Sequence, residues 1–434
     1  MNASNPGKKI AAANNATSAC KAGQAALATR LLKRISAASA DSGENLVFSP
    51  LSIHVALALM STAAAGDTLE EILAVVGAPS REELAAFVRD TVIDRVLADR
   101  SEIGGPSVAF ACGTWTDKRW PLRPAYVDAV VDTFKGDSWV VDFKNKSNQE
   151  SRSTLGWPGP QGTCPYSGNP DTVHVVANAI YFKGDWRNPF KKENTVDREF
   201  HRLDGSSVEV PFLQSGCYQY IACHDGFKVL KLPYEMMGEC NYELYCTLPK
   251  FSMCIFLPDE REGLRDLVEK ISSSPEFLRN HLPKDFVPVG EFRLPKFKLT
   301  YDSNIVHDLE SLGLRLPFSL DANLTDMLLE EDDREVLVSR VVHKAVIEMN
   351  EEGSEAAAVT VESDDDMGFS LYDYDEPEPE PVVNFVADHP FAFFIVKETS
   401  GAIVFAGHVL DPSKEEKTCA GPKTAFEAKH CGKP

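Results

Sequence analysis

Apolar residues recur along the chain in runs of two kinds, one with the period of a strand and the other with the period of a helix. Alternating or continuous apolar runs predict strands, one of them buried on both faces, at residues 108–115, 139–143, 173–186, 227–234, 251–259, 292–299 and 336–347. Packed apolar sequence resumes at Phe385 and continues to Val409. Helical stretches alternate with these strands, so the pattern favours a mixed α+β fold.

The longest apolar stretch, Leu46 to Ala65, contains Pro50, His54 and several hydroxyl residues. It is therefore predicted to be a buried helix and not a membrane span. Ser49 can cap this helix, Pro50 suits its first turn and Gly66 can end it. Two short helices are predicted next, from the capping-box spacing of Thr68-x-x-Glu71 and Ser80-x-x-Glu83, and others near residues 25–38, 124–134 and 263–271.

Four segments depart from the packing pattern. Residues 1–24 are expected to form a flexible extension and residues 413–434 a flexible polar tail, on either side of a single domain at 25–412. Residues 145–171 are rich in Gly, Pro and Ser and show no helical period. Residues 361–380 hold nine acidic side chains and no basic one, so this segment cannot bury enough apolar surface to order itself.

Charge and composition exclude several classes of function. The 434 residues carry 44 basic and 65 acidic side chains, a net charge of −21, so no nucleic-acid partner is expected. Ten cysteines include no C-x-x-C pair and no metal-ligand spacing with the histidines, which predicts reduced thiols and no metal site. The run Asp364 to Asp366 lies in a flexible loop and lacks the rigid oxygen cage that a cation needs.

The common enzyme motifs do not occur in the sequence. There is no G-x-S-x-G elbow, H-E-x-x-H pair or phosphate-binding glycine loop, so we expect no enzymatic activity, no catalytic residue and no cofactor. No secretory leader is recognisable, which favours a cytoplasmic or nucleocytoplasmic protein over an extracellular one. We expect a monomer with no membrane partner.

The strand that ends at Ile347 leads into small residues and then into the acidic segment. The sequence from Asn350, Asn-Glu-Glu-Gly-Ser-Glu-Ala-Ala-Ala-Val-Thr, resembles the proximal hinge of a serpin reactive-centre loop. The segment from Phe385 to Phe391 resembles the sequence that follows such a loop, in a form most similar to plant serpins. The resemblance extends over about residues 25–412 and includes the stretches that begin at Asn45, Gly66 and Val173.

This resemblance implies a serpin fold of the α+β class, with three β-sheets, eight or nine helices and an exposed reactive-centre loop at 351–384. Serpins normally carry a surface helix across the large sheet in the interval that corresponds to 145–171. The Gly/Pro/Ser-rich sequence implies that this helix is absent or replaced.

The resemblance also implies a mechanism, suicide inhibition of a serine or cysteine endopeptidase that forms a covalent acyl complex with the cleaved loop. The amino-terminal half of the loop would then insert into the main sheet as a new strand. The hinge that must enter the sheet comprises Glu351, Glu352, Gly353, Ser354, Glu355, Ala356, Ala357 and Ala358. Small residues at its inward positions suit insertion, namely Ser354, Ala356, Ala358 and Thr360.

The same alternation places Glu362 and Asp364 inward, where an unpaired carboxylate costs several kcal/mol. The alternative function is therefore a non-inhibitory serpin that acts as a protease substrate, a binding protein or a storage protein. A defective product of a rearranged gene is a third reading.

The family's loop length places the reactive bond at Met367-Gly368. Seventeen residues separate this bond from Phe385, which is long for plant relatives. Alternative positions for the cleaved bond therefore stay open, at Asp366, Phe369, Leu371 and Tyr372.

Four polar residues match the serpin shutter, the cluster that lets the sheet open and close: Ser49, Ser52, Asn178 and His343. A hydrogen-bonded core network is the alternative reading, and the two are compatible because a bistable sheet needs paired polar groups in each state. Trp186 matches the family residue near the point where the loop begins.

Overall fold

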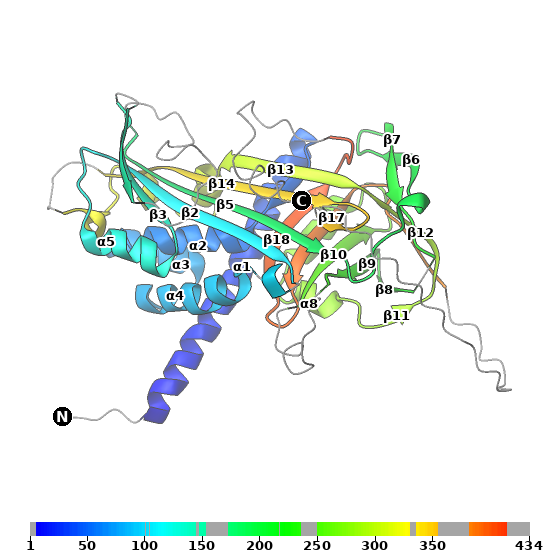
Figure 1. Ribbon diagram of the computed structural model, residues 1–434, viewed down its shortest axis with the longest axis horizontal. Helices are drawn as coiled ribbons and strands as arrows, with labels where there is room; N and C mark the ends of the chain where they lie inside the picture. Colours follow the sequence, from blue (N-terminus) through cyan, green and yellow to red (C-terminus); the bar gives the residue numbers. More distant parts are fainter. Residues whose placement is uncertain are drawn as a thin grey trace.

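A computed structural model describes residues 6–99, 101–103, 105–144, 147–152, 172–216, 218–235, 250–329, 336–354 and 382–414. Within these ranges the chain forms three β-sheets and eight α-helices, as predicted for the α+β serpin fold. The longest strands run across the top of the molecule in Figure 1, above the helices at one end and above a second sheet at the other.

The long sheet has the order β13 (Phe297–Asn304), β14 (Val338–Met349), β5 (His174–Asp185), β2 (Ser107–Asp117), β3 (Asp137–Asp142) and β4 (Ser147–Arg152). Its central neighbours β14 and β5 are parallel, and they pair from Val338 opposite His174 to Val346 opposite Tyr181. Beyond that point a two-residue strand, β15 (Gly353–Ser354), pairs with the end of β5.

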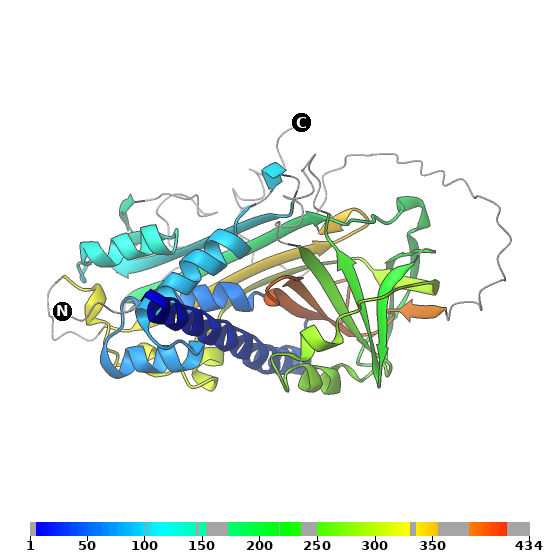
Figure 2. The ribbon, with the colours of Figure 1, turned by 90° about the horizontal axis from the view of Figure 1, so that it is seen from below.

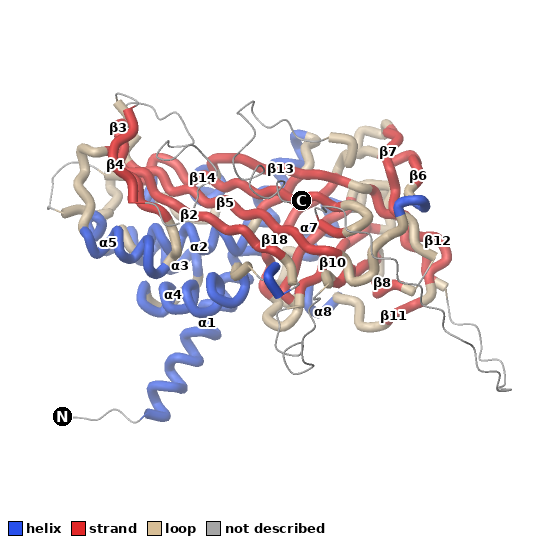
Figure 3. The backbone as a smooth tube through the Cα atoms, viewed as in Figure 1, coloured by secondary structure: helices blue, strands red, loops and turns tan. Residues whose placement is uncertain are grey.

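The second sheet has the order β1 (Leu46–Phe48), β18 (Ala402–Val409), β17 (Phe391–Lys397), β10 (Phe251–Pro258), β9 (Phe227–Pro233), β8 (Gln219–His224) and β11 (Phe286–Val287). The third sheet has the order β16 (Val383–Val386), β12 (Val289–Pro295), β7 (Ser207–Leu213) and β6 (Val196–His201). Figure 3 shows the strands of both gathered at the end of the molecule away from most of the helices.

The α-helices are α1 (Pro6–Ser42), α2 (Pro50–Ser61), α3 (Gly66–Val76), α4 (Arg81–Phe87), α5 (Pro124–Asp128), α7 (Leu264–Ile271), α8 (Phe277–His281) and α9 (Val306–Ser311). Two π-helical segments extend α4 and α5, at Val88–Val96 and Ala129–Thr133. Short 3-10 turns occur at Ser101–Ile103, Lys192–Asn194, Leu316–Phe318 and Thr325–Met327. No helix within the described ranges is long and apolar enough to cross a membrane.

Helix α2 is buried along its whole length, and its start follows the sequence prediction. The Ser49 side chain accepts a hydrogen bond from the Ser52 amide, and Pro50 occupies the first turn. Its bounds need two corrections. Leu46–Phe48 forms β1, because these residues can pair with β18, and Gly66 begins α3 instead of ending α2.

The two capping-box predictions have different outcomes. Ser80 caps α4 by accepting a hydrogen bond from the Glu83 amide, as predicted. Thr68 does not cap α3, because that helix already begins at Gly66. The Thr68 hydroxyl instead accepts a hydrogen bond from the amide of Asn323, which ties α3 to a distant loop.

The first helix begins much earlier than predicted. Alanine, the best helix former, recurs through the first forty residues, and α1 runs from Pro6 to Ser42. The prediction of a flexible extension up to residue 24 is therefore wrong from Pro6 onward. Cys20 is fully buried, and Gly23 packs against the end of α3, where a Cβ atom would lie 2.2 Å from the Val76 carbonyl oxygen. Figure 2 shows this dark blue helix lying along the lower side of the body.

One further prediction needs correction. The run at 292–299 is divided between β12 and β13, which are separated at Lys296. Within the interval 145–171, Ser147–Arg152 forms β4 and pairs with β3, so this part extends the sheet edge. Residues 153–171 lie outside the described residues, as do the loop positions from 355 to 381 and the tail from 415.

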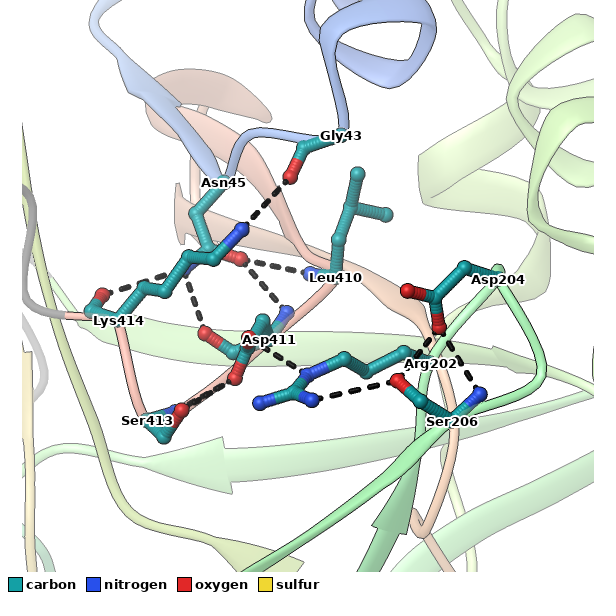
Figure 4. Close-up of polar contacts among 9 residues, drawn as sticks. All are labelled: Gly43, Asn45, Arg202, Asp204, Ser206, Leu410, Asp411, Ser413 and Lys414. Carbon is teal, nitrogen blue, oxygen red and sulfur yellow. Dashed lines mark hydrogen bonds and ion pairs between the residues drawn. The ribbon is translucent and has the colours of Figure 1, made fainter.

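The last described residues are fixed to the body by the polar cluster in Figure 4. The Asn45 side chain accepts hydrogen bonds from the amides of Leu410 and Asp411 and donates to the Asp411 carbonyl at 2.7 Å. The Asp411 carboxylate is buried and pairs with Arg202 at 2.7 Å. These contacts connect β1, β18 and the turn after β6, so the second and third sheets are held together at this point.

Candidate functional site

The hinge forms a tight turn at the end of β14. The Asn350 amide donates to the Gly353 carbonyl oxygen at 2.9 Å, and the Asn350 side-chain oxygen accepts from the amides of Glu352 and Gly353. The turn reverses the chain, so β15 runs antiparallel to β5, with Gly353 opposite Asp185 and Ser354 opposite Gly184. Two hinge residues therefore already belong to the long sheet.

Gly353 is required by close backbone contact. A Cβ atom at this position would lie 2.1 Å from the Gly184 carbonyl oxygen and 2.7 Å from the Asp185 Cα, distances that no side chain tolerates. Only glycine therefore lets the hinge approach β5 so closely.

Two aromatic residues, Trp186 and Tyr234, form hydrogen bonds with the hinge. Trp186 is buried, donates its indole N–H to the Asn350 carbonyl oxygen at 3.0 Å and donates its amide N–H to the Glu352 carbonyl oxygen. Its ring stacks on Tyr234, with centroids 4.6 Å apart. The Tyr234 hydroxyl lies 2.6 Å from Oγ of the fully buried Ser354. Asn350, Glu352 and Ser354 thus each form a hydrogen bond with Trp186 or Tyr234.

The two hinge glutamates are held by charged and polar partners. Glu351 is buried, and its carboxylate accepts hydrogen bonds from Lys296 at 2.9 and 3.0 Å and from the Thr195 hydroxyl at 2.8 Å. Burial alone would raise its pKa, but the hydrogen bonds outweigh that effect and the pKa of Glu351 is lowered. Glu352 pairs at 2.5 Å with the exposed Lys192, whose pKa is raised by this hydrogen bond.

The four predicted shutter residues are fully buried and form one hydrogen-bonded cluster across α2, β5 and β14. His343 Nε2 accepts from the Ser49 amide at 2.9 Å, and His343 Nδ1 lies 2.5 Å from Asn178 Oδ1. The Asn178 amide group donates to the Ser52 carbonyl oxygen at 3.2 Å. Ser52 takes part through its backbone, since its hydroxyl has no hydrogen-bond partner within the described part of the chain.

The cluster fixes the protonation of His343. Because Nε2 accepts a hydrogen bond from an amide, the ring proton resides on Nδ1 and is donated to Asn178. Burial lowers the pKa of His343 to about 3, so the neutral ring persists through the physiological range. The bond to Asn178 therefore connects β14 to β5 through their side chains.

Sequence reasoning missed four residues of this site: Tyr234, Lys296, Thr195 and Lys192. Each contacts the hinge through its side chain, from a segment at least 55 positions away in the sequence. The predicted reactive bond Met367-Gly368 and its alternatives lie outside the described residues, as do Glu355, Ala356, Ala357 and Ala358 of the hinge. Among the described residues, no group of three His, Cys, Asp or Glu side chains is placed to hold a metal ion.

Comparison with known proteins gives consistent matches over most of the chain. A family described as serpin (serine protease inhibitor) matches residues 22–412. Putative serpin-Z5 of rice is 47% identical over 403 residues, 89% of this chain and 89% of that protein. Serpin-ZX of barley is 40% identical over 401 residues, 90% of this chain and 96% of that protein.

Solved structures also match. The structure of Arabidopsis AtSerpin1 in its native stressed conformation superposes with a TM-score of 0.76 at 34% identity, and the match covers 91% of this chain and 98% of that chain.

Proposed function

This chain belongs to the serpin family, whose members are generally protease inhibitors, and from that membership we propose that it is a suicide inhibitor of a serine or cysteine endopeptidase. The protease would attack the loop as a substrate and become acylated through its own nucleophile. Insertion of the amino-terminal part of the loop into the long sheet would then carry the protease away before the acyl bond is hydrolysed.

The observation that carries this proposal is the pairing of β15 with β5. A loop strand inserted between the parallel strands β5 and β14 must run antiparallel to both. Gly353 and Ser354 already run in that direction beside β5, next to the point where the β14 pairing ends at Tyr181. The hinge thus occupies the first step of the insertion path, and further residues can follow without a change of register.

Continuing this register predicts how the rest of the loop would pair. Each further loop residue moves one position back along β5, which brings Ala356 opposite Phe182 and Thr360 opposite Asn178. Residues opposite each other share a face of the sheet. Phe182 belongs to the main core and Asn178 faces α2. The small residues Ala356 and Thr360 would therefore lie on the face of the long sheet that packs against the core.

The shutter would have to open for this strand to enter. Insertion separates β14 from β5 and therefore breaks the bond from His343 to Asn178. The same register delivers the Thr360 hydroxyl beside Asn178, where it can replace the lost partner. The polar cluster would then be satisfied in both states, as a bistable sheet requires.

A second candidate function is supported by the same register. It places Glu362 opposite Val176 and Asp364 opposite His174, both on the core-facing side of β5. His174 is buried and its pKa is lowered to about 4, so it offers no positive charge to these carboxylates near neutral pH. If their burial stops insertion, the chain acts as a non-inhibitory serpin, a protease substrate or a binding protein.

The test is incubation of the full chain with a panel of serine and cysteine endopeptidases. Inhibition predicts a complex stable on a denaturing gel, cleavage near Met367 and a large rise in the melting temperature of the cleaved protein. Ala358→Glu, at an inward position, should be cleaved without forming the complex. Ala357→Glu, at the adjacent outward position, is the matched control and should retain it. Clean cleavage of the wild-type chain with no complex and no rise in melting temperature would support the non-inhibitory function.

A further inference from the structure

A small cavity lies between β16 and the adjoining ends of β9 and β10. Its volume is about 200 Å³. Leu257 and Pro258 of β10 and Val386 of β16 form its apolar lining, and its polar lining consists of Lys228, Asp259, Asn384 and His389. Because β16 belongs to the third sheet and β9 and β10 to the second, the cavity lies where the two sheets meet. Strand β16 is the orange arrow in Figure 2.

Lys228 is the feature of this cavity that points to a ligand. It lies opposite Leu257 in the β9–β10 pairing, so both side chains share the face that lines the cavity. The side chain is partly buried, yet within the described ranges it makes no ion pair with an acidic group. Asp259 lines the same cavity without coming within ion-pair distance of Lys228. An ammonium group that makes no ion pair at the edge of a cavity can attract an anion.

The other polar groups determine which anion fits. The side-chain oxygen of Asn384 accepts a hydrogen bond from the Glu291 amide at 2.8 Å, which leaves the Asn384 NH₂ group as a second donor. Both ring nitrogens of His389 already have partners, Asp388 and the Pro258 carbonyl oxygen, each at 2.8 Å. Exposed Asp259 repels a multiply charged anion such as phosphate, so a single negative charge is favoured.

We propose that this cavity binds a small monocarboxylate with an apolar body. The carboxylate would lie between Lys228 and Asn384, and the apolar part would contact Leu257, Pro258 and Val386. The cavity is larger than the roughly 150 Å³ apolar cavities that accept a benzene ring, so a ring-sized body fits. This assignment depends only on the cavity and not on protease inhibition.

Binding would affect the strand at the distal end of the loop. In the third sheet β16 pairs with β12 alone, and its four residues end at Val386. A ligand in contact with both β16 and β10 adds a connection between β16 and the second sheet. The carboxylate would therefore hold β16 in place, and hydrogen exchange at β16 should slow when the ligand is present.

The experiment is isothermal titration of the full chain with benzoate and with benzamide, its neutral analogue. The proposal predicts saturable one-site binding of benzoate, at least about tenfold tighter than that of benzamide. Lys228→Met should remove the preference for the carboxylate and leave benzamide binding unchanged, whereas Lys228→Arg should keep it. Lys231→Met is the matched control, because Lys231 lies on the same strand over the Tyr220 ring and not in the cavity.

Three results would overturn the proposal: no saturable benzoate binding to the wild type, equal binding of benzoate and benzamide, or unchanged benzoate affinity in Lys228→Met. Melting curves of each variant separate loss of the site from loss of the fold. Slower hydrogen exchange at residues 383–386 with benzoate, absent in Lys228→Met, identifies the cavity beside β16 as the place of binding.

Discussion

The hydroxyl of Tyr234 lies 2.6 Å from Oγ of Ser354, and both residues are buried. Tyr234 follows β9 of the second sheet, whereas Ser354 is the last described residue of the hinge in the long sheet. This contact therefore joins a hinge residue that pairs with β5 of the long sheet to the end of a strand of the second sheet. It fixes the position of the hinge beside β5, and Trp186 stacks on the Tyr234 ring.

Tyr234→Phe should weaken the attachment of the hinge to the second sheet. The substitution keeps the ring and its stacking on Trp186, but it leaves Ser354 Oγ buried without its partner. We expect the free energy of unfolding to fall by about 1 to 2 kcal/mol. Urea denaturation measures the change. The control is a double-mutant cycle, in which Tyr234→Phe should cost much less in a Ser354→Ala background. Equal costs in both backgrounds would show that the hydrogen bond contributes nothing.

Gly353→Ala should expel the hinge from β5. The added methyl group would lie 2.1 Å from the Gly184 carbonyl oxygen, and backbone atoms cannot move aside without breaking the β15 pairing. The Trp186 amide, which donates to Glu352, should then exchange its hydrogen faster. Hydrogen exchange of the peptide that covers Asp185 and Trp186 checks this. Gly216→Ala is the matched control, since a methyl group there meets no atom within 4 Å. Unchanged protection in Gly353→Ala would contradict the steric argument.

Lys296→Met should destabilise the hinge in a manner that depends on pH. The variant removes the charged partner of the buried Glu351 carboxylate, and among the described side chains Thr195 then remains as its partner. We expect the free energy of unfolding at pH 7 to fall by about 2 kcal/mol. The native pKa of Glu351 is lowered, so its contribution is present above the unfolded-state value of 4.5 and is lost as the pH falls through the native value. The stability difference between wild type and variant should therefore shrink below about pH 4.5.

Lys192→Met is the control for that experiment. Lys192 pairs with Glu352, but its side chain is 63% exposed, so water screens the interaction. Its removal should change urea stability much less than removal of Lys296. A larger effect at Lys192 would mean that Glu352, and not the buried Glu351, anchors the hinge.

These contacts show what the sequence could and could not predict. The polar cluster around His343, whose members lie up to 294 positions apart, was predicted from the resemblance to serpins, and so were the hinge residues from Asn350 onward, which form one continuous string. Their partners were not, because Glu351 contacts Lys296 across 55 positions and Thr195 across 156. Lys and Thr at strand ends carry no signal of what they bind. Helix α1 was underestimated for a different reason, since an alanine-rich segment shows little amphipathic periodicity even when it is helical.

Replacing both inward acids should improve inhibition. Glu362→Ala with Asp364→Ala removes two carboxylates that the β15 register would bring against Val176 and His174. Because burying an unpaired carboxylate costs several kcal/mol, we expect loop insertion on the order of tenfold faster or more. The measurement is the fraction of protease trapped per cleaved inhibitor. Asp365→Ala, at an outward position, should leave that fraction unchanged. No gain in the double variant would mean that these acids do not limit insertion.

His343→Gln should make the protein less sensitive to acid. Glutamine can accept from the Ser49 amide and donate to Asn178, but it does not titrate. The native pKa of His343 is about 3, below the usual 6.5, so between these values the unfolded chain binds a proton that the native chain excludes. Wild-type stability must therefore fall as the pH drops from about 6.5 toward 3. Over the step from pH 6 to pH 4 the wild type should lose about 2 kcal/mol more than the variant.

Urea denaturation at the two pH values measures this difference. His307→Gln, which replaces an exposed histidine, is the control and should lose as much stability between pH 6 and pH 4 as the wild type. If His343→Gln also loses as much stability as the wild type, the His343 ring is not held neutral by the cluster that joins β14 to β5.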